Sequence, residues 1–203
     1  MRFPETTYRP LFGRILSIVI AVLGVGAIAS SVVAGDPLFA LRSVAPIGLT
    51  VTLVFAAFWL PSVSVRADEI EIRNVFSTHH VPWAAIRRID TKWALALETD
   101  RGTVSAWASP APGRYSIIGT TRGDVTRTAS SARAAGASIR PGDALSTPSG
   151  AIAHVIRTHW EELRDDGLLD QPGTGTGSRR VPHLTLIVTC AVLAAATALS
   201  VVL

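Results

Sequence analysis

Three basic residues that lie close together in the sequence, Arg87, Arg88 and Lys92, form the densest cluster able to bind an anion. Positive side chains near a membrane attract anionic lipid headgroups, at about 1 kcal/mol per charge. Asp90 lies within the cluster and neutralises part of it, and known polybasic lipid-binding segments carry more charges. Two interpretations stay open: a lipid or anion surface, and an ordinary solvated strand edge, which is favoured.

The other polar groupings do not predict catalysis. His79 and His80 are adjacent, and adjacent side chains on a strand point to opposite faces, so the two cannot readily chelate one metal ion. The glycine run at residues 173–177 follows no strand and opens no nucleotide-binding unit, which indicates a linker. No H-E-x-x-H, G-x-S-x-G or P-loop motif occurs, and Cys190 is the one cysteine. We therefore predict no catalytic residues, no metal site and no cofactor.

The elements that must position these residues are bounded by three uncharged apolar runs, residues 15–34, 43–60 and 184–203. At about 1.5 Å of rise per residue, helices of these lengths span most or all of the ~30 Å hydrocarbon core of a bilayer. A buried core helix is the alternative, but none of the runs has a polar face at helical spacing. The sequence predicts three transmembrane helices, the first two as a hairpin.

Basic residues near the ends of these runs predict the topology. They are Arg2, Arg9 and Arg14 before the first run, Arg66 and Arg73 after the second, and Arg179 and Arg180 before the third. The positive-inside rule then predicts a multi-pass plasma-membrane protein with its N-terminus and residues 61–182 in the cytoplasm and its C-terminus outside. A signal peptide cleaved after residues 32–34 is the alternative, but the first run exceeds the usual ~7–15 residues of a signal core.

The polar stretch after the second run begins with the pattern of β-strands. Val63 and Val65, then Ile70 and Ile72, alternate with polar residues, and this period of two marks strands with one buried face. Further strands are expected over residues 79–83, 93–98 and 103–108. The pattern indicates a small antiparallel sheet. Its expected core comprises Trp83, Ile86, Trp93, Leu95, Leu97, Trp107 and Trp160.

One amphipathic helix is expected after the strands, at about residues 148–166. Pro148 suits a first helical turn, and Ile152, Ile156 and Trp160 recur at helical spacing. The expected organisation is a tail and hairpin at 1–60, a polar domain at 61–168 with an insertion at 116–146, a linker at 169–183 and a third span at 184–203.

Two short elements resemble a known family. They are Val81-Pro82-Trp83 with Ile86 and Ile89, and Trp107-Ala108-Ser109-Pro110 before Pro112-Gly113. They are similar to the bacterial pleckstrin-homology (PH)-like domains of small actinobacterial membrane proteins, the low-molecular-weight protein antigen family. The resemblance covers residues 61–115 and implies a bent antiparallel sheet closed at one end by a C-terminal helix.

The resemblance does not imply a phosphoinositide ligand. Inositide-binding PH domains keep Lys and Arg around the turn that joins their first two strands. Here that turn carries Asp68, Glu69 and Glu71, which would repel phosphate.

These features predict an α+β membrane protein: three transmembrane helices and a cytoplasmic PH-like antiparallel β domain closed by a C-terminal α-helix. The expected function is that of a non-enzymatic, membrane-anchored binding or scaffolding module, with the lipid bilayer and a membrane protein as partners. Sensing of an anionic lipid surface and an unrecognised membrane enzyme are the alternatives. A net charge of +4 without a dense basic patch predicts no nucleic-acid binding, and no small-molecule ligand is indicated.

Overall fold

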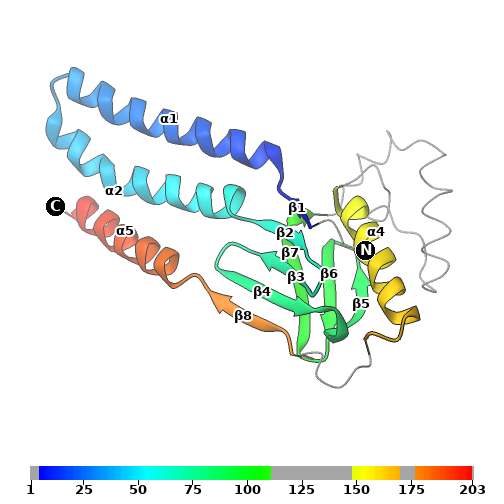
Figure 1. The fold of residues 1–203 in the computed structure, drawn as a ribbon. Helices are drawn as coiled ribbons and strands as arrows, with labels where there is room; N and C mark the ends of the chain where they lie inside the picture. The colour runs from blue at the N-terminus through cyan, green and yellow to red at the C-terminus, as the bar shows by residue number, and fades with distance from the viewer. Residues whose placement is uncertain (1–4, 111–147, 170–176, 203) are drawn as a thin grey trace. The chain divides into compact units, whose positions relative to one another are not determined.

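The computed structural model describes residues 5–110, 148–169 and 177–202, and the chain divides into two compact units (Figure 1). The helical unit consists of Arg9–Pro61, Asn74–Ser77 and Val181–Leu203. The β unit consists of Met1–Tyr8, Ser62–Arg73 and Thr78–Arg180. The expected insertion at residues 116–146 lies outside the described residues.

The helical unit begins with two long helices, α1 (Leu11–Val33) and α2 (Pro37–Val54), and a π-helical segment, η1 (Phe55–Trp59), prolongs α2. The backbone N–H of Phe39 donates to the Asp36 carboxylate at 2.9 Å, and Pro37 occupies the first turn of α2. Such a cap followed by proline is a strong signal for a helix start. The second helix therefore begins at Pro37 rather than near Ser43, and it includes Arg42.

Two helices are long and apolar enough, by length and composition, to cross a membrane: Leu11–Val33 and Pro37–Trp59, each of 23 residues. Few of their residues are buried, and Phe12 and Val25 are 74% and 68% exposed. The third helix, α5 (Leu184–Val202), is apolar over the shorter stretch Leu184–Ser200. Among the described residues, two helices thus have spanning length, and the third span stays a prediction.

Glycines bring the three helices into close contact. A Cβ at Gly13 would clash with the backbone carbonyl oxygen of Phe58, and one at Gly24 would lie 2.7 Å from a methyl carbon of Ile47. At Gly48 a Cβ would lie 3.6 Å from Leu193 of α5. Small residues allow such close backbone approach between membrane helices.

The β unit contains two sheets. The larger has five strands in the order β1-β2-β3-β4-β8. These are β1 (Thr6–Tyr8), β2 (Ser62–Val65), β3 (Glu69–Arg73), β4 (Ser77–Pro82) and β8 (Arg179–Pro182). The edge strands β1 and β8 fall in segments expected to be a tail and a linker. They have three and four residues, too few for an alternating pattern to reveal them.

The smaller sheet is antiparallel, with β5 (Ile86–Asp90), β6 (Ala94–Thr99) and β7 (Gly102–Pro110). Strand β5 escaped prediction because its register shifts between Ile86 and Arg88, which interrupts the alternation of apolar and polar residues. The turn between β6 and β7 uses Gly102 at φ +123°, a conformation that other residues rarely adopt.

The core of the β unit joins both sheets and the helix α4 (Pro148–Asp165), which contacts β6 and β7 (Figure 1). Ile70 and Ile72 of β3, Leu95 and Leu97 of β6 and Ile156 of α4 are fully buried. Antiparallel sheets packed with one C-terminal helix make this an α+β domain.

Trp83, Ile86 and Trp160 of the expected core lie in or against it. Trp83 is 3% exposed, and its indole N–H donates to the carbonyl oxygen of Arg66 at 3.1 Å. Ile86 is also 3% exposed, and Trp160 packs partly buried against the cluster.

Trp93 and Trp107 were expected in the core as well, and that expectation is wrong, since they are 79% and 58% exposed. Trp93 lies in the turn before β6, outside the alternation that buries Leu95 and Leu97. On β7 the inward positions are Val104, Ala106 and Ala108, so a period of two directs Trp107 outward.

Candidate functional site

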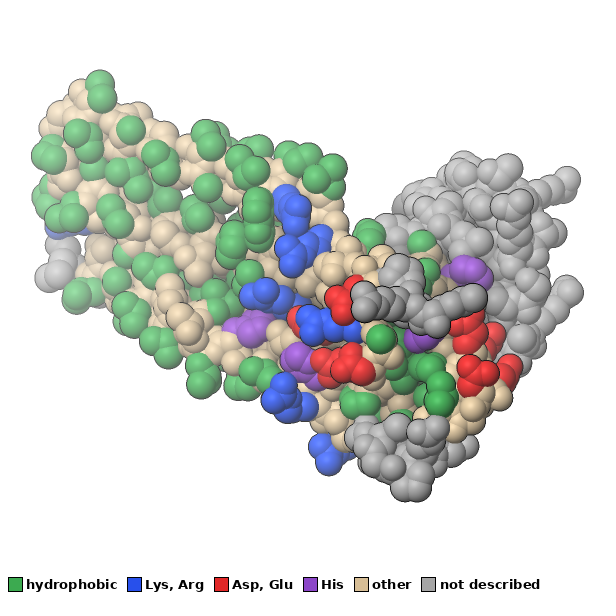
Figure 2. Space-filling model, in the orientation of Figure 1, with side chains coloured by type: hydrophobic (Ala, Val, Ile, Leu, Met, Phe, Trp, Pro, Cys, Tyr) green, Lys and Arg blue, Asp and Glu red, His purple; other side chains and the backbone are tan. Residues whose placement is uncertain are grey.

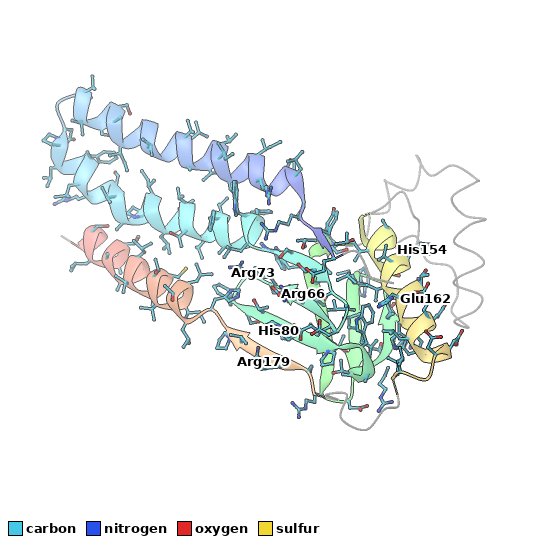
Figure 3. All side chains as sticks on the ribbon, viewed as in Figure 1. Arg66, Arg73, His80, His154, Glu162 and Arg179 are labelled. Carbon is cyan, nitrogen blue, oxygen red and sulfur yellow. The ribbon has the colours of Figure 1, made fainter. Side chains whose placement is uncertain are left out.

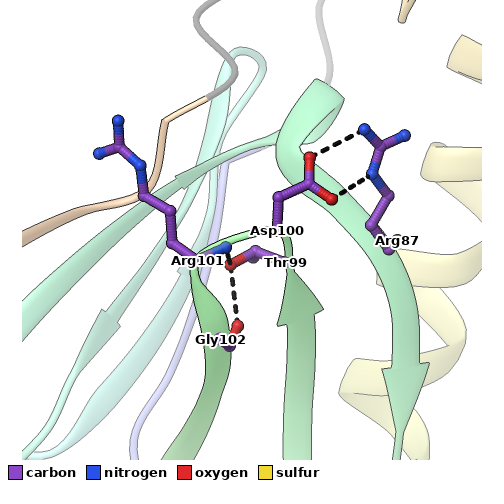
Figure 4. Close-up of polar contacts among 5 residues, drawn as sticks. All are labelled: Arg87, Thr99, Asp100, Arg101 and Gly102. Atoms are coloured by element: carbon purple, nitrogen blue, oxygen red, sulfur yellow. Dashed lines mark hydrogen bonds and ion pairs between the residues drawn. The ribbon is translucent and has the colours of Figure 1, made fainter.

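The predicted basic cluster is divided by ion pairing. Arg87 makes a bidentate pair with Asp100: its Nε lies 2.9 Å from Oδ1 and its Nη2 lies 2.8 Å from Oδ2 (Figure 4). The hydrogen bond from Arg87 holds the pKa of Asp100 below its usual value. A guanidinium held by one carboxylate is less available to a lipid phosphate.

The other two members of the cluster also lie beside acidic or aromatic groups. Arg88 stands opposite Glu98 in the register of β5 and β6. The Lys92 ammonium is 5.6 Å from the ring centre of Trp93, a cation–π distance. The structure therefore brings Arg87 and Arg88 together on β5, with Lys92 in the following turn, in a setting of mixed charge.

The two histidines lie on opposite faces of β4, as the sequence predicts. His80, labelled on β4 in Figure 3, stands opposite Glu71 in the register. Its Nδ1 is 2.7 Å from a carboxylate oxygen of Glu69. His79 stands opposite Ile72, on the core face. Burial chiefly, with Arg180 and His80 adding to it, lowers the pKa of His79. The described residues contain no group of three His, Cys, Asp or Glu that could hold a metal ion.

The outward face of the large sheet pairs its charges across strands. Arg66, which follows β2, lies 2.6 Å from the Glu71 carboxylate of β3. Thr7 and Ser64 share a hydroxyl hydrogen bond of 3.0 Å on the same face. Because Arg66 is paired in this way, the turn that follows it presents Asp68 without a compensating cation among the described residues.

A pocket of about 350 Å³ lies in the β unit where three segments meet: the β2–β3 turn, the end of β4 with the 3-10 turn η2 (Trp83–Ala85), and the C-terminal end of α4. Its lining residues are Ala67, Asp68, Glu69, Pro82, Trp83, Ala84, Leu163, Leu168 and Leu169. Seven of these nine are apolar, two are acidic and none is basic. The composition suits an apolar or cationic ligand rather than an anion.

The sequence analysis missed the leucines of this pocket, although a signal for them exists. Gly167 has φ +69°, the Leu168 N–H donates to the Leu163 carbonyl oxygen at 2.9 Å, and the Gly167 N–H donates to that of Arg164 at 3.0 Å. This is the Schellman arrangement that ends many helices, and an apolar contact across it commonly accompanies it. A glycine followed by leucine after an amphipathic helix therefore predicts the position of Leu168 beside Leu163.

Two sheets with a C-terminal helix place the β unit in the class of small α+β domains. Residues 60–111 match a family described as a bacterial PH domain. The resemblance to bacterial PH-like domains is thus confirmed for this part of the chain, and PH domains are generally non-enzymatic. No curated protein and no solved structure matches the chain.

Proposed function

We propose that this protein is a non-enzymatic, membrane-anchored binding module that uses its PH-like domain to hold a protein partner within a membrane complex. Its N-terminus and PH-like domain lie at the cytoplasmic face of the plasma membrane. Three helices cross the bilayer, and the C-terminus lies outside.

The observation that carries the membrane anchoring is the exposure of apolar side chains on α1 and α2. Leu23 is 62% exposed and Leu41 71% exposed, whereas Leu95 and Leu97 of the PH-like domain are fully buried. Contiguous apolar surface of this extent is unfavourable in water and favourable in lipid.

The third span is supported by length and by helix contact. Helix α5 has 19 residues, which reach ~28 Å at 1.5 Å of rise per residue. A bilayer accommodates a slightly short span at small cost. Helix α5 also packs against α2, where Gly48 lies beside Leu193.

The orientation is supported by basic residues at the ends of the helices. Arg14 lies in the first turn of α1, and its guanidinium lies 5.4 Å from the ring centre of Trp59 at the end of η1. An Arg beside a Trp is typical of a membrane–water interface, and Arg is enriched on the cytoplasmic side. Arg179 and Arg180 precede α5 in the same sense.

A protein partner is favoured over a lipid headgroup because the predicted lipid surface is of mixed charge. Arg87 is paired with Asp100, and the β2–β3 turn carries Asp68 and Glu69. Sensing of anionic lipid is the second candidate, and the exposure of Arg88 and Lys92 favours it. Under that alternative, Arg88→Ala with Lys92→Ala weakens binding of the chain's PH-like domain to phosphatidylserine vesicles, and unchanged binding excludes it.

Cysteine labelling tests the anchoring and orientation. In a Cys190→Ser background, Ala34→Cys places a thiol in the turn between α1 and α2, and Thr103→Cys places one on an exposed strand position. A membrane-impermeant maleimide added to sealed cells should label Ala34→Cys only, and Thr103→Cys should react only after permeabilisation. The reverse pattern would refute the orientation, and extraction of the chain by alkaline carbonate would refute the anchoring.

A further inference from the structure

Residues that line the pocket of the PH-like domain are held in place by hydrogen bonds and ring contacts. The indole N–H of Trp83 is held by the Arg66 carbonyl oxygen, and its ring meets that of His159 edge-on, with centroids 4.9 Å apart. On the opposite wall, the Schellman bonds after α4 fix the backbone that carries Leu168, which is 40% exposed. A preformed apolar pocket loses little conformational entropy when an apolar group enters it.

The charge around this pocket is acidic on balance, although Arg164, which follows Leu163, pairs with Asp165 at 3.2 Å. Asp68 and Glu69 line the pocket, and Asp165 and Asp166 stand at the end of α4, between the lining residues Leu163 and Leu168 in the sequence. Figure 2 shows apolar side chains in this part of the domain with acidic side chains on either side. Asp68 is exposed and makes no ion pair within the described part of the chain. The local field therefore attracts cations.

We propose that this pocket binds a basic segment with an apolar anchor, of the kind that adjoins the cytoplasmic end of a membrane helix in a partner protein. An apolar side chain of that segment enters between Trp83 and Leu168, and neighbouring Lys or Arg side chains lie against Asp68 and the acidic end of α4. This inference rests on the proposed function, which keeps the domain at the cytoplasmic face, where juxtamembrane segments are rich in Lys and Arg. Confinement to the same membrane raises the effective concentration of such a segment.

Other occupants fit less well. Phosphate and anionic headgroups are repelled by Asp68 and Glu69. Residues 170–176, which follow Leu169, contain Asp170 and no basic residue, so they offer no charge complement. Residues 111–147 of the same chain include five arginines, such as Arg114 and Arg122, and they are the competitor that the experiment must separate.

The experiment measures binding of a fluorescent peptide to the full chain in detergent micelles. The peptide carries a leucine pair flanked by arginines, and the two control peptides replace the arginines by glutamates or the leucines by serines. We expect the basic, leucine-containing peptide to bind and both controls to fail. Leu168→Ser should weaken binding about tenfold through lost apolar burial, and Asp68→Asn about threefold through lost attraction. Glu5→Gln is the matched control for Asp68→Asn, because Glu5 is an exposed acid that directly precedes β1. It should leave binding unchanged.

Each other result overturns the proposal. Equal binding of the glutamate peptide would remove the charge argument, and equal binding to wild type and Leu168→Ser would place the peptide elsewhere. No binding to wild type, together with crosslinks from a photoreactive group at position 168 to residues 111–147, would assign the pocket to the chain's own segment. Crosslinks between two copies would assign it to a homodimer. Peptide binding in micelles does not depend on membrane topology. Cysteine labelling therefore tests the proposed orientation, peptide binding tests the pocket, and either result can be negative without the other.

Discussion

Two regions of this chain use the same apolar residue types in opposite ways. In the PH-like domain Val63, Leu95 and Leu97 are fully buried. On α1 the equivalent residue types, Val22 and Leu23, are 64% and 62% exposed. The domain is built to exclude water from its interior, whereas the helices present their apolar surface outward. This difference is the one expected under the proposed membrane anchoring, with water around the domain and lipid around the helices.

The largest effect that tests this comparison is expected from matched leucine truncations. Leu97→Ala leaves a cavity in the core and should lower the free energy of unfolding of the PH-like domain by about 2–5 kcal/mol. Leu23→Ala removes the same atoms from an exposed position on α1 and should change it by less than about 0.5 kcal/mol. Urea titration of the detergent-solubilised chain, with folded domain quantified by pulse proteolysis, measures both. Equal losses would mean that α1 contributes to the domain's core.

The next effect concerns the helices themselves. Gly13→Ala forces a Cβ against the backbone carbonyl oxygen of Phe58. Because backbone atoms cannot move aside as a flexible side chain can, the helical unit should be destabilised by about 1–3 kcal/mol. Gly26→Ala is the matched control, because no atom lies within 4 Å of the added Cβ. Titration with a denaturing detergent, followed by helical circular dichroism, compares the two. If Gly26→Ala is as harmful as Gly13→Ala, the α1–η1 contact does not govern the stability of the helical unit.

The sequence predicted the elements that have a long or regular pattern. The apolar runs became helices, Ile70/Ile72 and Leu95/Leu97 became strands with one buried face, and the helix at 148–166 is α4 within a residue. The short edge strands β1 and β8 and the bulged β5 could not be predicted, since hydrogen bonds to a neighbouring strand, rather than local pattern, define them.

The tryptophans show where sequence reasoning about the core fails. Hydrophobicity alone placed Trp107 inside, but its neighbours Ala106 and Ala108 take the inward positions and the period of two then excludes it. Arg157 is the opposite case, a charged residue that is buried. It is 9% exposed, and a guanidinium nitrogen donates to the Ile89 carbonyl oxygen at 3.4 Å. Residue type predicts burial on average, whereas register decides it for a given side chain.

The candidate site divides in the same way. The basic cluster is visible in the sequence, but its pairing with Asp100 depends on the β5–β6 register. The pocket joins residues nearly a hundred positions apart, Asp68 and Leu163, and no local pattern announces it. What the sequence did indicate was the acidic turn, and that turn supplies the charged edge of the pocket.

Trp83 and Trp107 give a sharper contrast between buried and exposed aromatic residues. Trp83→Phe removes the indole N–H, which donates to the part-buried carbonyl oxygen of Arg66. Because that oxygen then lacks this donor, the free energy of unfolding should fall by about 1–2 kcal/mol. Trp107→Phe, at a position 58% exposed, should change it by less than about 0.5 kcal/mol. The same urea titration distinguishes them. A larger loss at Trp107 would show that its outward face is covered in the folded chain.

The smallest expected effect comes from the exposed Arg87–Asp100 pair, and its pH dependence has a definite sign. The pair holds the pKa of Asp100 below its unfolded value of about 4, so its stabilising contribution is present above that pH and is lost as pH falls through the folded-state pKa. The stability difference between wild type and Arg87→Ala should therefore shrink between about pH 5 and pH 2. It should also shrink at high salt, because solvent screens a pair at the surface. Urea titrations at several pH values measure the difference, with Arg88→Ala as the control that leaves the pair intact. A difference that stays constant on acidification would mean that Arg87 stabilises the sheet through packing of its side-chain stem rather than through Asp100.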